Sequence, residues 1–353
     1  MREYTKLCDV CDFQGGSQPP KDEWSFDLKA GYIRMLQIRD FTQSERVVPE
    51  YIKITKTTKT CEADDILIAR YGASLGKILT GLAGAYNVAI MKAIPDTNML
   101  EKKYLYYYLK SPIFQGFLLN VGSRAAQAGF NKNDLQDLLI PNITRNEQVE
   151  IVGILERVET VIEVRQKELQ KLDNLLKARF VEMFGDPIRN TQKRPITELI
   201  NVVKMQRGFD LPVQERQQDG EIPVFGSNGA LDHHNVAKVK GGGVITGRSG
   251  TIGNVYYTEG DYWPLNTSLF SVDTHGNNIV YLAYLLTMYD LSRFTEGTGV
   301  PTLNRNKFHD KPIIDVSLVE QKNLQTLFNK SINQNFFVSI RKKSEKPLRS
   351  LGN

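Results

Sequence analysis

The run GRSGTIG, residues 247–253, has the residue types of a ligand-binding loop. Glycine occupies every third position after a short apolar segment, as in loops whose backbone N–H groups hold a phosphate. A phosphate loop of the G-x-x-x-x-G-K-[ST] type also ends in a lysine and a hydroxyl residue, which this run lacks. A nucleotide-binding enzyme is therefore a weak alternative, which titration with nucleotides would reveal.

A second copy of this run occurs earlier in the chain. ILIARYGASLGKI, residues 66–78, matches VITGRSGTIGNV, residues 244–255, with one additional residue. Arg70 and Arg248 correspond, as do the glycines and the aliphatic residue that follow them. A nucleotide loop has no reason to occur twice with its length altered. The glycines instead predict a strand-to-strand turn that presents an arginine in each copy.

Two cysteines could form part of a metal or redox site. Cys8 and Cys11 have C-x-x-C spacing, but a second ligand pair is missing, and all four histidines lie after residue 230. The equivalent positions in the second copy hold Ile200 and Val203. We therefore expect buried positions on a short helix, which free cysteine fills readily, and no metal site.

The correspondence extends through most of the chain, in the same order. TKLCDVCDFQGGSQPP (5–20) matches TELINVVKMQRGFDLP (197–212), and FNKNDLQDLLIPNITRNEQ (130–148) matches LNRNKFHDKPIIDVSLVEQ (303–321). Shorter blocks between them match as well, while the offset drifts as it does in diverged duplicates with variable loops. One large unit is present twice, which excludes a short-period solenoid.

A long helix is predicted between the copies. Apolar residues recur in steps of four and three and stop before Gly185-Asp186-Pro187, which cannot continue a helix. The matching segment after Gln321 predicts a shorter, more polar helix. We expect antiparallel pairing of the two helices, with a solvated terminal helix as the alternative. The expected seam residues are Ile151, Leu155, Val158, Ile162, Leu169, Leu172, Leu176, Leu324 and Phe328.

The fold class that follows is α+β. Short strands between glycines and amphipathic helices predict two mixed modules, and the tyrosine stripe of residues 104–108 predicts core packing. The expected boundaries are 1–145 for the first module, 146–186 for the central helix, 187–318 for the second module and 319–353 for the terminal helix.

Composition sets broad limits. The 353 residues have ordinary apolar and charged fractions and a formal net charge of +5, which permits a polyanionic partner without requiring one. The sequence has no apolar run of membrane-spanning length, and MREYTKLCDV is not typical of a signal peptide. A cytoplasmic protein without membrane contact is the expectation.

Two variable modules, each followed by a helix that begins at a Glu-Gln pair, resemble the specificity subunit of type I restriction–modification systems over essentially the whole chain. The resemblance rests on the duplicated blocks quoted above and on the helix ending ARFVEMFGDP. It implies that each module is a target recognition domain for one half of a split site in double-stranded DNA. It also implies that the helices fix the gap between the half-sites and dock two methyltransferase subunits.

The same resemblance implies a non-catalytic chain without a cofactor of its own. S-adenosylmethionine and ATP are expected on partner subunits, and restriction (translocase and nuclease) subunits are expected among the partners. The sequence agrees, since it has no Asn-Pro-Pro-Tyr motif and no nuclease-like cluster of acids with a lysine. A coiled-coil adaptor that binds only proteins, and an orphan or inactive specificity subunit, are the alternatives.

Polar residues in the loops around the repeated blocks are the candidate DNA contacts, because Arg and Lys suit guanine and phosphate while Asn and Gln suit adenine. Residues shared by the copies, such as Gln14 and Gln206, are expected to serve common tasks, and residues that differ are expected to carry specificity. The candidates in the first module are Gln14, Gln18, Arg70, Tyr71, Ser74, Lys77, Arg124, Gln127 and Lys132. Those in the second are Gln206, Arg207, Ser227, Asn228, Arg248, Ser249, Thr251, Asn254, Thr298 and Arg305.

Overall fold

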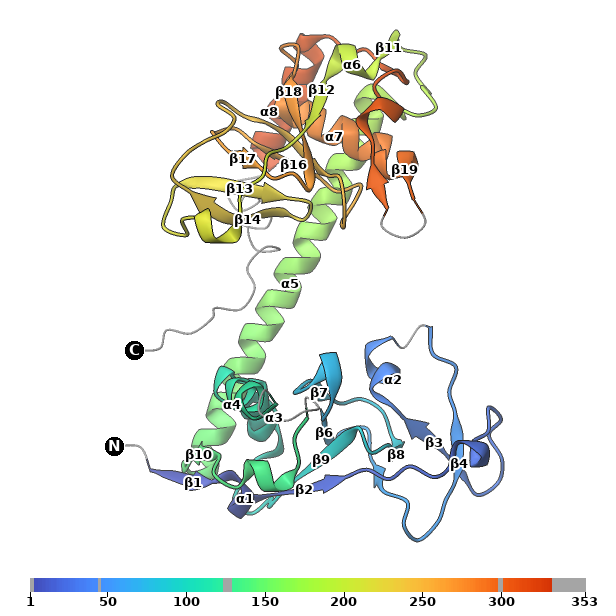
Figure 1. Cartoon of the computed structure of the whole chain (residues 1–353), viewed down its shortest axis with the longest axis vertical. Helices are drawn as coiled ribbons and strands as arrows, with labels where there is room; N and C mark the ends of the chain where they lie inside the picture. Colours follow the sequence, from blue (N-terminus) through green and yellow to red (C-terminus); the bar gives the residue numbers. More distant parts are fainter. Residues whose placement is uncertain (1–2, 44–45, 123–128, 298–300, 332–353) are drawn as a thin grey trace. The chain divides into compact units, whose positions relative to one another are not determined.

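The computed structural model describes residues 3–43, 46–122, 129–297 and 301–331 (Figure 1). The chain divides into two compact units, residues 1–162 and 163–353. Each unit is described by itself. Unit 1 contains the first module, unit 2 contains the second, and the long helix α5 contributes residues to both.

Unit 1 is built from short strands and a few helices. Its described strands form two four-stranded sheets, in the orders β2-β9-β6-β7 and β4-β3-β8-β5, and the pair β1-β10. The strands are β1 (Tyr4–Lys6), β2 (Cys11–Gly15), β3 (Tyr32–Leu36), β4 (Tyr51–Lys53), β5 (Thr60–Cys61), β6 (Ile66–Ala69), β7 (Ile78–Leu79), β8 (Gly84–Tyr86), β9 (Ile90–Pro95) and β10 (Leu139–Pro141). The helices are α1 (Leu7–Val10), α2 (Ile38–Thr42), α3 (Lys102–Lys110) and α4 (Pro112–Gly122).

Unit 2 has a similar composition. Its described strands form a four-stranded sheet in the order β12-β18-β15-β16, a three-stranded sheet in the order β14-β13-β17, and the pairs β11-β21 and β19-β20. The strands are β11 (Ile196–Glu198), β12 (Lys204–Arg207), β13 (Ile222–Gly226), β14 (Gly229–His234), β15 (Gly243–Gly247), β16 (Val255–Thr258), β17 (Trp263–Pro264), β18 (Ser268–Asp273), β19 (Thr295–Glu296), β20 (Thr302–Leu303) and β21 (Pro312–Ile314). The helices are α6 (Leu199–Val202), α7 (Ile279–Tyr289) and α8 (Leu318–Ser331).

The two units share one frame, which confirms the duplicated α+β fold. The first strand of each unit pairs antiparallel with a strand near the end of the module, Thr5 opposite Ile140 and Thr197 opposite Ile313. The order β2-β9-β6-β7 corresponds to β12-β18-β15-β16, and a parallel strand pair occurs in each unit as β3-β8 and β13-β17. Equivalent residues of the duplicated blocks therefore occupy equivalent places.

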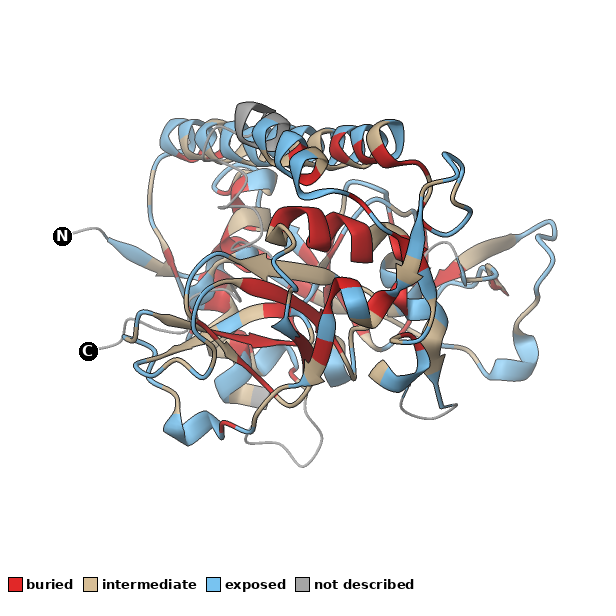
Figure 2. Cartoon of the chain, turned by 90° about the horizontal axis from the view of Figure 1, so that it is seen from above, coloured by how far each residue is buried: buried red, intermediate tan, exposed pale blue. Residues whose placement is uncertain are grey.

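Burial follows the sheets and the helices that pack on them (Figure 2). In α3, Tyr104 and Tyr108 are buried, so this part of the tyrosine stripe belongs to the core of unit 1. In α7, residues from Val280 to Leu286 are all buried, because this helix lies between the main sheet of unit 2 and the end of α5.

Helix α5 spans Arg145–Phe184 and has clear start and stop signals. A capping arrangement begins it, in which the Glu147 carboxylate accepts from the backbone N–H and the hydroxyl of Thr144, both at 2.7 Å. It ends before Gly185, whose φ of +80° is the left-handed conformation that stops helices. The predicted end of the helix at Gly185 is confirmed.

The core contacts of α5 differ from a regular heptad seam. In the first half of the helix, Glu159 accepts hydrogen bonds from the Tyr107 hydroxyl and the Lys110 ammonium of α3. The hydrogen bond from Tyr107 is the main cause of a lowered Glu159 pKa. Near its end, Phe180 and Phe184 enter the core of unit 2 and contact Tyr281. Both phenylalanines are absent from the predicted seam, because they continue Leu176 in steps of four rather than in alternating steps.

The predicted seam residues fall into three environments. Leu176 of α5 and Leu324 of α8 both belong to the buried core of unit 2. Four residues are half-buried and two are exposed, while the Phe328 side chain and residues 332–353 lie outside the described part. The half-buried residues are Ile151, Leu155, Leu169 and Leu172, and the exposed ones are Val158 and Ile162.

A buried glutamine at the start of each module-ending helix explains the repeated Glu-Gln pair. In unit 1 the Gln148 side chain accepts from the backbone N–H of Glu101 at 2.8 Å and donates to two backbone carbonyl oxygens. In unit 2 the Gln321 side chain accepts from the N–H of Asn278 at 2.8 Å. Glu101 and Asn278 are the N-cap residues of α3 and α7, so each glutamine ties two helix starts together.

The cysteines occupy apolar positions. Cys8 lies in α1, but Cys11 begins strand β2 and is not part of the helix, which corrects the expectation that both residues lie on one helix face. Burial raises the pKa of the Cys11 thiol to about 12, which makes it a poor metal ligand. Within the described ranges, no three His, Cys, Asp or Glu residues are grouped as metal ligands. No helix in the described part of the chain is long and apolar enough to cross a membrane.

Candidate nucleic-acid interface

The GRSGTIG run forms the turn between the antiparallel strands β15 and β16, as predicted for a strand-to-strand turn. Gly250 and Gly253 have φ values of +83° and +90°, and a Cβ atom on Gly247 would collide with the Thr251 carbonyl oxygen. The Thr246 hydroxyl donates to the Asn254 carbonyl oxygen at 2.9 Å and closes the turn. A strand follows the turn, so the helix N-terminus of a phosphate loop is missing from this site.

The backbone of Arg248 is fixed on both sides. Its N–H donates to the Thr267 carbonyl oxygen at 2.9 Å, and its carbonyl oxygen accepts from the Leu303 N–H at 2.8 Å. The half-buried Arg248 side chain has no hydrogen-bond or ion-pair partner among the described residues. The structure therefore holds a free guanidinium at a rigid point of unit 2.

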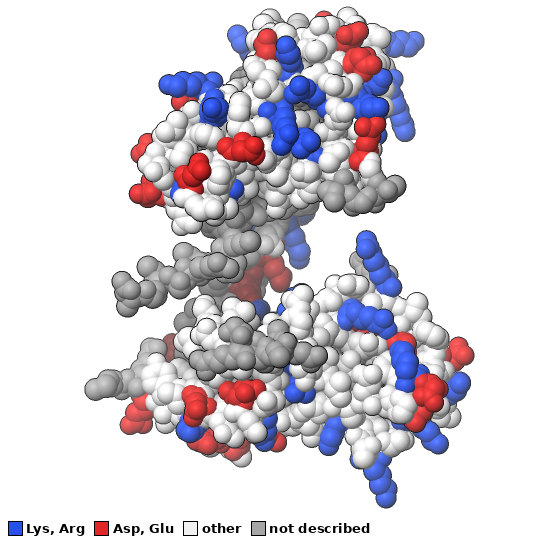
Figure 3. All heavy atoms as spheres, viewed as in Figure 1, with Lys and Arg blue, Asp and Glu red and all other residues white. Residues whose placement is uncertain are grey.

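Two more cations lie beside this turn. Arg207 ends β12 opposite Leu269 of β18, and Arg305 follows two residues after Leu303. Arg207 and Arg305 line one hollow of about 540 Å³, together with Gln206, Gly208, Phe209 and Asp210. Lys and Arg side chains gather on this face of unit 2 (Figure 3). The Asp210 carboxylate accepts a hydrogen bond from the Asn266 side chain, and the two free guanidinium groups of the hollow can bind a phosphate or a base edge.

The pKa of His309 is affected by the positive charges on this face of unit 2. Its pKa is lowered first by burial and then by the positive charges of Arg305 and Lys204. The Nε2 atom accepts a hydrogen bond from the Met205 backbone N–H at 3.0 Å, so the neutral imidazole is the form that fits. Lys204 was not among the predicted contacts, although its equivalent in the first copy is the oppositely charged Asp12.

The equivalent arginine of unit 1 has a different environment. Arg70 donates from Nε to the Phe130 carbonyl oxygen and from a terminal nitrogen to the Val88 carbonyl oxygen, both at 3.1 Å. Its guanidinium also lies over the Tyr71 ring, 5.0 Å from the centroid. A hollow of about 740 Å³ is lined in part by Arg70, Tyr71 and Asn131. Arg70 and Arg248 were expected to share one task, but Arg70 ties loops together and Arg248 is free.

Lys132 of unit 1 also has a partner. Its ammonium forms an ion pair with Asp12, and this hydrogen bond is the main cause of a lowered Asp12 pKa and a raised Lys132 pKa. Gln14 accepts from the Tyr86 hydroxyl at 3.0 Å. The candidate side chains of unit 1 near β2 are therefore largely occupied by bonds within the unit.

The remaining candidates are placed as follows. Ser227 packs beside the GRSGTIG turn, since its backbone and hydroxyl oxygens approach Gly247 and Gly250. Arg124, Gln127 and Thr298 lie outside the described residues. The exposed candidates are Gln18, Tyr71, Lys77, Asn228 and Asn254, and the half-buried ones are Ser74, Ser227, Ser249 and Thr251.

Two copies of one α+β frame, each with polar turns at the edge of its main sheet, define a duplicated two-module protein with a long helix between its modules. The chain belongs to the family of the type I restriction modification DNA specificity domain, whose model matches residues 2–174 and 189–336. The two matched regions correspond to the two copies of the frame.

Two curated relatives are specificity subunits of type I restriction enzymes. The chain is 23% identical over 171 residues to the type I restriction enzyme MjaVIII specificity subunit of Methanocaldococcus jannaschii, which covers 47% of this chain and 40% of that protein. It is 25% identical over 173 residues to the type I restriction enzyme EcoBI specificity subunit of Escherichia coli, which covers 45% of this chain and 36% of that protein. The matched regions thus span well under half the length of these relatives.

Solved structures show the same fold. The S subunit of a type I restriction–modification system from M. genitalium is similar over 97% of this chain and 93% of that chain, with a TM-score of 0.51 and 17% identity. A chain from a study of type I restriction–modification complex assembly is similar over 97% of this chain and 92% of that one, with a TM-score of 0.50 and 14% identity.

Proposed function

We propose that this chain is the DNA-specificity subunit of a type I restriction–modification complex, and that each unit binds one half of a bipartite site in double-stranded DNA. The observation that carries the proposal is the family match to both copies of a frame whose equivalent strands, β2 and β12, present different side chains. Gly15 corresponds to Arg207 and Asp12 corresponds to Lys204, for example. Different side chains in equivalent places suit two half-sites of different sequence.

The helices supply the rest of the proposed role. Several apolar side chains of α5 are exposed, including Ile154, Val158, Val161, Ile162 and Val164. An exposed apolar stripe on a long helix favours partner helices or subunits. In this proposal the paired helices set the distance between half-sites and dock two methyltransferase subunits.

Catalysis belongs to the partners in this proposal. The methyltransferase subunits bind S-adenosylmethionine, and the restriction subunits use ATP, while this chain binds neither and selects the DNA sequence. The polar turns described above contribute binding and position only.

Methylation sequencing tests the proposal directly. Deletion of the gene from its source strain should remove methylation at one bipartite motif, and the gene supplied in trans should restore it. A chimaera with a foreign second module should keep one half of the motif and change the other. A chain that binds the methyltransferase subunit in a pull-down, but shifts no DNA with it, would instead be an adaptor or an inactive specificity subunit.

A further inference from the structure

Four equivalent positions were compared between the two units, and the charge differs at two of them. Unit 2 has Lys204, Arg207, Arg248 and Arg305, which we name the four-cation face. The equivalent residues of unit 1 are one acid, one glycine and two cations, namely Asp12, Gly15, Arg70 and Lys132. The frame is the same, so the difference lies in the side chains alone.

Contacts within the frame bring the three arginines of the four-cation face together. Arg207 on β12 and the end of β15 flank the same strand, because both Arg207 and Thr246 pair with Leu269 of β18. Two strands on either side of a third lie about 10 Å apart. The Leu303 N–H donates to the Arg248 carbonyl oxygen, which brings Arg305 to the same edge.

The residue beside the loop arginine differs between the two units. A Cβ atom on Gly15 would lie 3.4 Å from a terminal nitrogen of Arg70, an ordinary contact distance, so position 15 lies directly beside the bonded guanidinium. Arg207 occupies the equivalent position in unit 2. If Arg248 adopted the bonded conformation of Arg70, its guanidinium would lie close to the side chain of Arg207. Two positive charges at contact distance repel each other, so this conformation is unfavourable in unit 2.

Lys132 of unit 1 and its equivalent Arg305 of unit 2 also differ in the charge of a neighbouring residue. In unit 1 Asp12 neutralises Lys132, whereas in unit 2 the position of Asp12 holds Lys204. Lys204 precedes Met205, whose N–H donates to His309 Nε2, and the His309 N–H donates to the Arg305 carbonyl oxygen, so Lys204 and Arg305 flank the same histidine. Neither Lys204 nor any arginine of the four-cation face has an ion-pair partner among the described residues.

We infer that the four-cation face is the electrostatic anchor of the DNA complex, and that unit 1 contributes little to phosphate binding through its equivalent residues. The inference rests on the proposed function and goes beyond it, because it divides the work unequally between two similar units. Phosphate contacts make DNA affinity salt-dependent and need no particular sequence. The anchor therefore holds any duplex, while the residues of unit 1 at the four equivalent positions add little to this salt-dependent binding.

The test is the salt dependence of binding between the full chain and a random-sequence DNA duplex. Each phosphate contact adds about 0.9 to the slope of log affinity against log salt concentration. Arg248→Ala and Arg305→Ala should each lower the slope by about 0.9, and Arg248→Lys should restore most of it. Lys132→Ala should lower the slope by far less than either arginine variant.

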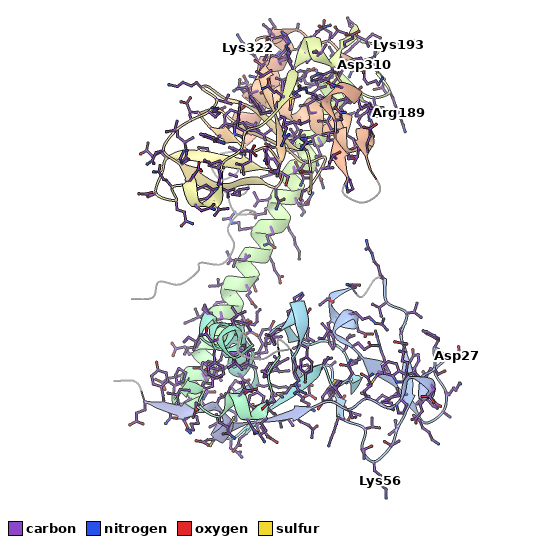
Figure 4. All side chains as sticks on the ribbon, in the orientation of Figure 1. Asp27, Lys56, Arg189, Lys193, Asp310 and Lys322 are labelled. Carbon is purple, nitrogen blue, oxygen red and sulfur yellow. The ribbon has the colours of Figure 1, made fainter. Side chains whose placement is uncertain are left out.

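A gain-of-charge variant and a matched control complete the test. Asp12→Lys copies Lys204 into unit 1 and should raise the slope. Lys193→Gln removes an exposed cation that does not line the hollow of unit 2 (Figure 4), and should leave the slope unchanged. Equal losses from Lys132→Ala and Arg305→Ala would overturn the inference while preserving DNA binding. Absence of any duplex binding at low salt would overturn the proposed function itself.

Discussion

The Arg70 guanidinium donates to the carbonyl oxygen of Phe130 at 3.1 Å, so the loop arginine of unit 1 joins its turn to the duplicated Asn-x-Asn block. The equivalent pair in unit 2, Arg248 and Leu303, meets through backbone atoms alone. One side chain is thus a structural tie and its counterpart is a free cation. The distinction makes the two arginines separable by experiment.

Arg70→Ala should destabilise unit 1. Hydrogen bonds from a charged donor to buried acceptors contribute about 1.5–3 kcal/mol each, and Phe130 is buried, so we expect a loss of about 2 kcal/mol. Hydrogen exchange of the β6 and β7 amides measures the change locally. Arg248→Ala is the matched control and should change stability by about 0.5 kcal/mol or less. Similar losses in both variants would contradict the difference between the two arginines.

The buried glutamines should be equally sensitive in both units. Gln148→Ala leaves the Glu101 N–H without its acceptor, and Gln321→Ala does the same to the Asn278 N–H. An unsatisfied buried polar group costs about 1–3 kcal/mol, so each variant should accelerate amide exchange at one helix start, α3 or α7. Gln166→Ala, an exposed change on α5, is the control. Faster exchange throughout both units would show that the glutamines do not act locally.

Local signals in the sequence predicted much of the frame. The glycines around Arg70 and Arg248 set a turn, and Gly185 stops a helix, because both effects depend on a few adjacent residues. Self-comparison then placed equivalent strands in equivalent positions. The Glu-Gln pair was recognised as a landmark, but its bonds to residues some 45 positions away in sequence follow only from tertiary packing.

The roles of the candidate contacts were less predictable. The alignment of the two copies predicted one task for Arg70 and Arg248. Their surroundings differ, however, because Gly15 lies beside Arg70, whereas Arg207 occupies the equivalent position in unit 2. Lys204 was missed for the same reason, since its significance appears only beside Arg305 and His309. The aligned copies do contain a sign of this difference, because the charge reverses at one position, from Asp12 in unit 1 to Lys204 in unit 2.

Acidification should destabilise unit 2 through His309. Its pKa is lowered by burial and two cations, so in the folded state it binds a proton less readily than in the unfolded state, where the pKa is about 6.5. The stabilisation is therefore complete above about pH 6.5 and is lost as the pH falls towards the folded pKa. Hydrogen exchange of the Met205 amide, which donates to Nε2, at pH values on both sides of about 6.5 measures the effect.

The first copy supplies a natural control for this titration. Gln136 occupies the equivalent position, and a glutamine can accept a hydrogen bond without titrating. His309→Gln should therefore flatten the pH dependence, whereas His275→Gln, at an exposed loop position, should retain it. An unchanged pH dependence in His309→Gln would assign the effect to another group.

The length of α5 should set the spacing of the DNA site if the proposed function is right. Residues 161–167 are all exposed, so their removal deletes one heptad without emptying either core. The helix becomes about 10.5 Å shorter at 1.5 Å per residue. With about 3.4 Å per base pair, the preferred spacer should shorten by roughly three base pairs while both half-sequences stay the same. Methylation sequencing with the variant gene reads spacer and half-sites together. Replacing the same seven residues with alanines keeps the length and should keep the spacer, so a changed spacer there, or an unchanged one after deletion, would refute the ruler role of this helix.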